Sequence, residues 1–309
     1  MDLDFGPNII VSIGLAISKT PAAHLLLPPS REEEKTALDD MELPFDVLDY
    51  IFGLLRSDPE TLVECSKAHP MFSQILNRHL FYHIVIHLGP FASNTRQGYN
   101  LSIHHLIKLV SETPQLVDHV RVLEIQFPDS YVFLDQKDQY FEEFASILST
   151  FSALKSIILL SEHDISWRKI MPLNLKTALE SCLYLPTVQQ VYVSILQFPL
   201  SLLGTNPNIN LLFLSGWPRT PESSENHPCP QLKSLSVGRI YGTSLRIFST
   251  WAKRHIAKLQ FLKCDYADEK VVLELLEACS DTLEFLDLNL KVRSSECKES
   301  SSCFSSFTQ

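Results

Sequence analysis

Seven short segments of this 309-residue chain repeat one pattern, with apolar residues at the first, fourth and sixth positions. The triplets are Val120/Leu123/Ile125, Leu154/Ile157/Leu159, Val188/Val191/Val193, Ile209/Leu212/Leu214, Leu232/Leu235/Val237, Ile256/Leu259/Phe261 and Leu283/Leu286/Leu288. The first positions of successive triplets lie 34, 34, 21, 23, 24 and 27 residues apart. A unit that recurs at such a period buries its apolar side by stacking on its neighbours. The pattern therefore predicts an array of repeated strands.

Helical patterns lie between several of these segments, with apolar residues three and four positions apart. The helical sets are Phe141, Phe144, Ala145 and Leu148; Leu175, Ala178, Leu179 and Cys182; Leu245, Phe248 and Trp251; and Val271, Val272, Leu275 and Leu276. Strands alternating with helices at this period predict an α/β fold, a solenoid with a curved parallel sheet and helices outside. A doubly wound α/β domain shows the same alternation and is the alternative. The 1-4-6 pattern favours the solenoid.

The later spacings resemble those of leucine-rich repeats, and the earlier ones require longer inserts. Cys264 stands at the ninth position of the sixth segment, where leucine-rich repeats carry Asn or Cys. The other segments lack this residue, so the resemblance is to an irregular leucine-rich-repeat-like domain, which we expect over residues 87–293.

Ahead of the repeats, residues 41–86 predict three short helices followed by a strand at His83–Ile86. The apolar residues Leu43, Val47, Leu48, Ile51, Leu54 and Leu55 follow the spacing of one helical face. Asp58 and Pro59 predict the start of the second helix, because Asp accepts from free N–H groups and Pro has none to satisfy. His69-Pro70 ends that helix, since a residue before proline disfavours the α conformation. Such a small unit buries too little apolar surface to be stable alone.

This stretch resembles an F-box, the motif by which substrate receptors of SCF-type ubiquitin ligases dock on a Skp-family adaptor. The matching residues are Leu43-Pro44, Asp46-Val47-Leu48, Ile51-Phe52, Leu54-Leu55, Asp58-Pro59 and Thr61-Leu62. Residues 73–86 are similar to the end of F-boxes in mushroom-forming fungi. The segment from Lys67 to Phe72 departs from the family, whose members usually carry a tryptophan there. The resemblance implies an adaptor-binding surface made of Leu43, Pro44, Val47, Leu48, Ile51 and Leu55.

A helical trio before a repeat domain is the order seen in F-box proteins with leucine-rich repeats. The resemblance therefore implies a non-catalytic substrate receptor that binds a Skp adaptor, and through it a cullin, and holds a protein target on its repeats. One alternative is a repeat scaffold unrelated to ubiquitin, in which the trio caps the N-terminal end of the array. An α/β enzyme with an unfamiliar site is another.

The strand pattern also predicts a target-binding face. Positions four and six of each repeat point into the core, so positions three, five and seven point out along the sheet. In the sixth repeat this assignment gives Lys258, Gln260 and Leu262. In repeats two to four it gives an apolar patch of Ile158, Leu160, Tyr192, Leu211 and Phe213. Exposed apolar patches of this kind usually bind a partner, although long inserts or the N-terminal arm could cover this one.

Composition and charge restrict the remaining possibilities. A net charge of −10 argues against binding a phosphate backbone. The seven cysteines form no CxxC pair and fit reduced thiols in the cytoplasm or nucleus. The apolar run at residues 9–17 is too short to span a bilayer and follows acidic residues, unlike a signal peptide. We expect a flexible extension over residues 1–40 and a disordered serine-rich tail over residues 294–309.

The chain shows no catalytic signature for nucleotide binding, acyl transfer or metalloproteolysis. On a continuous helix, His79, His83 and His87 would lie on one face, where three imidazoles could bind zinc. The strand-like residues between the last two separate them, however, so we expect neither a metal nor a cofactor.

Overall fold

The computed structural model describes residues 43–88, 99–127, 139–161, 167, 172–215, 230–238, 248, 251–265 and 269–289. The described residues from Phe45 onward belong to one compact unit. The extension expected over residues 1–40 and the tail expected over residues 294–309 lie outside the described residues. Within the described ranges, no helix is both long and apolar enough to cross a membrane.

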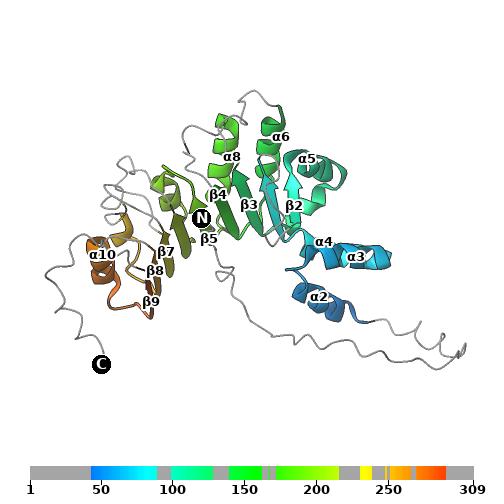
Figure 1. Cartoon of the computed structure of the whole chain (residues 1–309). Coiled ribbons are helices and arrows are strands. Elements are labelled where there is room, and N and C mark those ends of the chain that lie inside the picture. The colour runs from blue at the N-terminus through cyan, green and yellow to red at the C-terminus, as the bar shows by residue number, and fades with distance from the viewer. Residues whose placement is uncertain are drawn as a thin grey trace, which may run out of the picture. The chain divides into compact units, whose positions relative to one another are not determined.

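Nine parallel strands form a single sheet with the order β2-β1-β3-β4-β5-β6-β7-β8-β9 (Figure 1). The strands are β1 (His83–His87), β2 (Tyr99–Ser102), β3 (Val122–Phe127), β4 (Ser156–Ser161), β5 (Gln190–Ser194), β6 (Leu211–Ser215), β7 (Ser234–Gly238), β8 (Phe261–Asp265) and β9 (Phe285–Asn289). From β3 to β9 each strand pairs with the next one along the chain. The predicted α/β class with a parallel sheet is confirmed, and sequential pairing is compatible with a solenoid.

One backbone carbonyl before each strand sets the register of the following strand. The carbonyl of Arg121 accepts the N–H groups of Lys155 at 2.7 Å and Ser156 at 3.0 Å. The same pair of bonds recurs at the carbonyls of Tyr82, Lys155, Gln189, Asn210, Lys233 and Gln260. From Arg121 onward these carbonyls are 34, 34, 21, 23 and 27 residues apart, so the connections vary in length while the register stays constant.

Alternate strand residues face a core shared with the helices. On β3 to β7 the inward residues are Leu123, Ile125, Ile157, Leu159, Val191, Val193, Leu212, Leu214, Leu235 and Val237, and all are buried as predicted. The prediction is wrong for the seventh repeat, whose Leu286 and Leu288 are exposed at 41% and 36%, because β9 is the last strand of the described sheet. The elements between the strands are α5 (Ile103–Glu112), η2 (Pro114–His119), α6 (Gln139–Leu148), α8 (Leu173–Leu183), η4 (Leu200–Thr205) and α10 (Glu269–Cys279). Their buried side chains, such as Phe144 and Leu179, belong to the same apolar cluster. We call the opposite side of the sheet the outward face.

The sixth predicted repeat is wrong by three residues. In the structure Leu262 pairs with Leu235 of β7, and Cys264 pairs with Val237. The sequence allowed the error because both Ile256/Leu259/Phe261 and Leu259/Leu262/Cys264 satisfy the 1-4-6 pattern. The outward residues of β8 are therefore Phe261, Lys263 and Asp265, in place of Lys258, Gln260 and Leu262. Cys264 is consequently a core residue of the strand.

Polar side chains before the strands fix neighbouring repeats to one another. The buried amide of Asn206 donates to the carbonyls of Leu183 at 3.0 Å, Leu185 at 2.8 Å and Val188 at 3.3 Å. Thr282 plays a similar part before β9, where its hydroxyl donates to the carbonyl of Leu259 at 2.9 Å. These side chains supply donors to backbone carbonyls at the turns between repeats.

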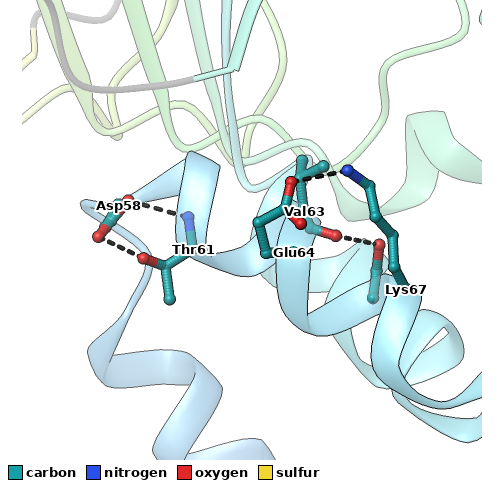
Figure 2. A network of polar contacts seen from close by, with 6 residues as sticks. Asp58, Thr61, Val63, Glu64 and Lys67 are labelled. Carbon is teal, nitrogen blue, oxygen red and sulfur yellow. Dashed lines mark hydrogen bonds and ion pairs between the residues drawn. The ribbon is translucent and has the colours of Figure 1, made fainter.

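Three helices occur where residues 41–86 predicted them: α2 (Phe45–Leu54), α3 (Pro59–Ala68) and α4 (Pro70–Leu80). Asp58 caps α3 as expected, accepting from the backbone N–H of Thr61 at 3.0 Å and from its hydroxyl at 2.7 Å (Figure 2). The Thr61 hydroxyl is the main reason that the pKa of Asp58 is lowered. An ion pair between Lys67 and Glu64 lies further along the same helix (Figure 2).

The helical trio is joined directly to the sheet. The predicted boundary at residue 86 falls inside β1, which pairs with β3 on one side and β2 on the other. The sequence pattern did not identify β2, which is four residues long and follows a stretch rich in turn-forming residues. Apolar residues of the trio, including Leu62 and Leu76, share one buried cluster with the strands.

Candidate protein-interaction surfaces

Helix α2 is apolar on two sides. Its inner side carries Leu48 and Phe52, which are buried at 5% and 4% exposure. The other side carries Val47, Tyr50, Ile51 and Leu54, which are all exposed, Tyr50 at 69% and Leu54 at 61%. These four residues follow the spacing i, i+3, i+4 and i+7, which places them on one stripe of the helix. We call this stripe the α2 outer face.

The predicted adaptor surface contains residues from both sides of the helix. Val47 and Ile51 lie on the α2 outer face, whereas Leu48 is buried and Leu55 packs partly against the core. Leu43 and Pro44 are exposed and precede α2 in the chain. The sequence pattern could not separate the two sides because nearly every position that is not acidic is apolar. Tyr50 was missed for the same reason. It lies three residues after Val47, and this spacing, which places both residues on one side of the helix, could have identified it.

A polar network fixes α2 against α4 beneath this face. His79 of α4 is buried, and its Nε2 lies 2.5 Å from an Asp49 carboxylate oxygen. Arg56 Nε donates to His79 Nδ1 at 2.8 Å, so the proton of the neutral ring resides on Nε2 and is donated to Asp49. Arg78 also forms an ion pair with Asp49. Burial lowers the pKa of His79, opposed by its bond to Asp49, and the ring is neutral near pH 7.

The three histidines considered for zinc do not meet. His79 is held in this network, His83 Nε2 lies 3.3 Å from a carboxylate oxygen of Glu124, and His87 Nε2 lies 3.0 Å from Asn100 Oδ1. A strand places His83 and His87 in the sheet, which separates them from the helical residue. Among the residues that the structure describes, no group of three potential metal ligands converges.

The outward face of the sheet is divided into rows that cross the strands. The central row runs through Val85, Glu124, Ile158, Tyr192, Phe213, Ser236, Lys263 and Asp287. Val85 and Glu124 are buried, while Ile158, Tyr192 and Phe213 are partly buried. The rings of Tyr192 and Phe213 lie 6.2 Å apart, and burial raises the pKa of the Tyr192 phenol. The structure thus places these predicted patch residues side by side.

Leu160 and Leu211, the other predicted patch residues, occupy the flanking rows of the outward face and are also partly buried. Leu211 pairs with Gln190 of β5, and Leu160 pairs with Ser194. The apolar patch is therefore continuous over β4, β5 and β6. Its residues are more shielded than those of the α2 outer face.

A different surface follows on β7, β8 and β9. The outward residues of β7 are Ser234, Ser236 and Gly238, all small, and we call them the β7 strip. Beyond it, the rings of Phe261 and Phe285 stack at 4.9 Å with an interplanar angle of 3°. The pairing of these rings was missed because the predicted phase of the sixth repeat placed Lys258, Gln260 and Leu262 on the outward face of β8 in place of Phe261.

Charged side chains lie beside that ring pair. Lys263 Nζ lies 3.1 Å from an Asp287 carboxylate oxygen and 3.8 Å from one of Asp265. The hydrogen bond to Asp287 is the main cause of a raised pKa for Lys263, which keeps it charged. Two carboxylates around one ammonium leave a local excess of negative charge.

A polar hollow of about 450 Å³ opens at the start of β8 and β9. It is lined by Lys233, Lys258, Gln260, Asp281, Thr282, Leu283 and Glu284. Two lysines and two carboxylates balance the charge of this lining, and Gln260 donates to Glu284 at 2.9 Å. This arrangement resembles a solvated surface recess more than a binding site for an ion.

The described cysteines are structural. Cys65, Cys182, Cys264 and Cys279 are free thiols. Burial raises the pKa of Cys182 and Cys264 to about 12, which keeps both protonated and poorly nucleophilic. Cys182 donates to the carbonyl of Leu148 at 3.4 Å and so joins α8 to the end of α6.

Comparison with known proteins adds no assignment to these surfaces. No protein-family model matches the chain, and no curated protein matches its sequence.

Proposed function

We propose that this chain is the substrate-recognition subunit of an SCF-type ubiquitin ligase. In this proposal the helical trio is an F-box that docks on a Skp-family adaptor, and the repeat sheet holds a protein target. The chain supplies binding surfaces and no catalytic group, and it works in the cytoplasm or nucleus. The free thiols among its described cysteines fit either compartment.

The α2 outer face carries this proposal. A helix that is apolar on both sides is normally buried on both sides, yet Val47, Ile51 and Leu54 remain exposed. A second apolar surface of this kind marks a protein-interaction site. The F-box resemblance names the partner, because Val47, Ile51 and Leu54 of this face are among the matching residues.

The internal network supports the proposal by showing how the helix is held. Asp49, Arg56, Arg78 and His79 tie α2 to α4 from the inner side. The outer side chains are therefore presented on a fixed helix, which lowers the entropy lost on binding.

A capping role is the alternative, and one observation favours it: the inner side of the trio shares its apolar core with the sheet. A cap requires only that inner side. Capping does not explain why Tyr50 and Leu54 on the other side are also apolar.

Co-purification with a Skp adaptor tests the assignment. The substitutions Val47→Asp and Ile51→Asp together should abolish adaptor binding and leave the circular dichroism spectrum and unfolding midpoint unchanged. Interface anchors commonly cost about 2 kcal/mol or more each when truncated, so the pair should weaken binding by roughly three orders of magnitude. Leu273→Asp is the matched control, because Leu273 is an apolar residue on α10 that is even more exposed than Val47 and Ile51. If the double variant bound the adaptor as tightly as the native chain does, the assignment of the α2 outer face to adaptor binding would be wrong.

The target-binding half has a separate test. Tyr192→Ala with Phe213→Ala should release proteins that co-purify with the native chain, while the adaptor stays bound. Quantitative mass spectrometry of the two purifications gives the comparison. Loss of both adaptor and targets, with a lowered unfolding midpoint, would identify the pair as core residues instead.

A further inference from the structure

The β7 strip contains a polar group that no described residue satisfies. Ser236 is 8% exposed, and its Oγ is buried without a hydrogen-bond partner among the described residues. Its neighbours Leu235 and Val237 face the core, so the Ser236 side chain points to the outward face. A buried hydroxyl without a partner destabilises a protein, and a ligand that supplies the missing bond removes this cost.

Larger side chains flank the strip on both sides. Ser236 pairs with Phe213 of β6 and with Lys263 of β8, and Ser234 pairs with Leu211 and Phe261. Ser234 and Ser236 are thus shorter than the leucine, phenylalanine and lysine side chains with which they pair. Gly238 has no side chain, and a Cβ there would be in ordinary van der Waals contact with Ser215 Oγ at 3.5 Å.

The charges beside the strip select the kind of ligand. Asp265 and Asp287 outnumber Lys263, the ammonium between them. Phe285 is 54% exposed and presents a ring on which a guanidinium can stack. An excess of carboxylate beside an exposed aromatic ring favours a cationic side chain, above all arginine.

We propose that the β7 strip binds an extended segment of the target protein that carries an apolar residue closely followed by arginine or lysine. The apolar side chain lies over the strip between Phe213 and Phe261, and a backbone group of the segment hydrogen-bonds to Ser236 Oγ. The cationic side chain pairs with Asp265 and Asp287. This inference rests on the proposed function, because the segment belongs to the protein that the receptor holds.

The spacing follows from sheet geometry. Neighbouring strands are about 4.8 Å apart and alternate residues about 6.7 Å apart. Asp265 is one strand and two residues from Ser236, and Asp287 is two strands away, so each lies roughly 8 to 10 Å from the strip. A lysine or arginine one or two positions after the apolar residue spans that distance.

The test uses the full chain and fluorescein-labelled peptides of repeating Phe-Ser-Arg-Ser, with Phe-Ser-Glu-Ser and Ser-Ser-Arg-Ser repeats as matched probes. Fluorescence anisotropy should show the first probe binding at least tenfold more tightly than either of the others. Amide signals of Ser234, Ser236 and Gly238 should shift in heteronuclear NMR spectra. Equal binding of the basic and acidic probes would overturn the proposal.

Two variants separate recognition from folding. Asp265→Asn with Asp287→Asn leaves Lys263 as the net charge, so this double variant should prefer the glutamate probe over the arginine probe. Ser236→Ala should weaken the arginine probe several-fold while leaving the unfolding midpoint of the free chain unchanged or raised. A lowered midpoint for Ser236→Ala would show that another segment of the chain, or a second copy, already satisfies the hydroxyl, and would overturn the site.

The outcomes also distinguish the two proposals. Peptide binding without adaptor co-purification would retain the β7 strip and remove the ubiquitin-ligase assignment. Adaptor co-purification without peptide binding would retain the receptor and remove the strip as its target site.

Discussion

The helical trio and the repeat sheet are stabilised by different means. In the trio, a few side chains fix the arrangement: Asp58 caps α3, and His79 connects Asp49 with Arg56. In the sheet, backbone bonds recur at every repeat, and outward side chains take little part in them. Stability therefore depends on single residues in the trio and on the repeated backbone in the sheet. Exposed positions of the outward face, such as Gln190, are thus freer to vary in sequence than the interior of the trio.

The largest expected effect is on the inner side of α2. Leu48→Asp places an unpaired charge at a position that is 5% exposed and should destabilise the trio by about 4 kcal/mol or more. Ile51→Asp on the α2 outer face should change the unfolding free energy by less than about 0.5 kcal/mol. Urea unfolding followed by circular dichroism measures both. Equal losses of unfolding free energy for the two variants would show that the α2 outer face is packed like the inner side.

The next effect lies in the repeat region, at Asn206, whose buried side chain donates to three backbone carbonyls. Asn206→Ala should cost about 1–3 kcal/mol, because those buried carbonyls lose their donor. Asn208→Ala is the control, since Asn208 is exposed and its side chain donates to only the carbonyl of Pro186. The same unfolding experiment applies. A loss no larger for Asn206 than for Asn208 would mean that backbone bonds alone hold these repeats.

A smaller effect concerns pH. Burial lowers the pKa of His79 below its ordinary value of 6.5, so the unfolded chain binds more protons as the pH falls through 6.5. Stability should therefore decrease as the pH falls through 6.5 toward the folded-state pKa. His255, whose pKa burial also lowers, acts in the same direction in the sheet.

The variant His79→Gln should show a shallower dependence of the unfolding free energy on pH between 5 and 7. His105→Gln serves as the control because His105 is exposed on α5. If His79→Gln left the pH dependence of the unfolding free energy unchanged while His105→Gln reduced it, buried and neutral His79 would not be the source of that dependence.

The smallest effect is expected on the outward face. Gln190 is exposed on β5, and Gln190→Ala should alter the unfolding free energy by less than about 0.5 kcal/mol. Lys263→Met should cost no more than about 1 kcal/mol, as is usual for partly exposed ion pairs. Losses above 2 kcal/mol at both positions would show that this face is packed and would end the contrast with the trio.

The sequence predicted what depends on apolar periodicity and capping chemistry. Strand positions such as Ile157 and Leu159 are buried as expected, and Asp58 begins α3. Periodicity failed where two phases were equally apolar, as between Ile256 and Cys264. Strand β2 was missed because it is short, and its pairing with β1 depends on a tertiary contact that no local pattern encodes.

The candidate surfaces were predicted less completely for a related reason. The sequence shows that α2 carries many apolar residues, but it does not show which of them are buried. Only the packed structure shows that Leu48 faces inward while Tyr50 faces outward. Likewise, the position of Ser236 between Phe213 of β6 and Lys263 of β8, where its hydroxyl has no partner among the described residues, depends on strand pairing that no local pattern encodes. The two binding roles themselves stay predictions that the experiments above decide.

The paired bonds at one carbonyl per repeat have a consequence for how such a chain can change over generations. Since each strand is aligned only by the strand before it, a connection can gain or lose residues without displacing any later strand. The connections already range from 21 to 39 residues between equivalent carbonyls. Repeats related only to their neighbours can also be duplicated or removed as units. New recognition loops are therefore most easily acquired between strands, where added length leaves the alignment of every other repeat intact.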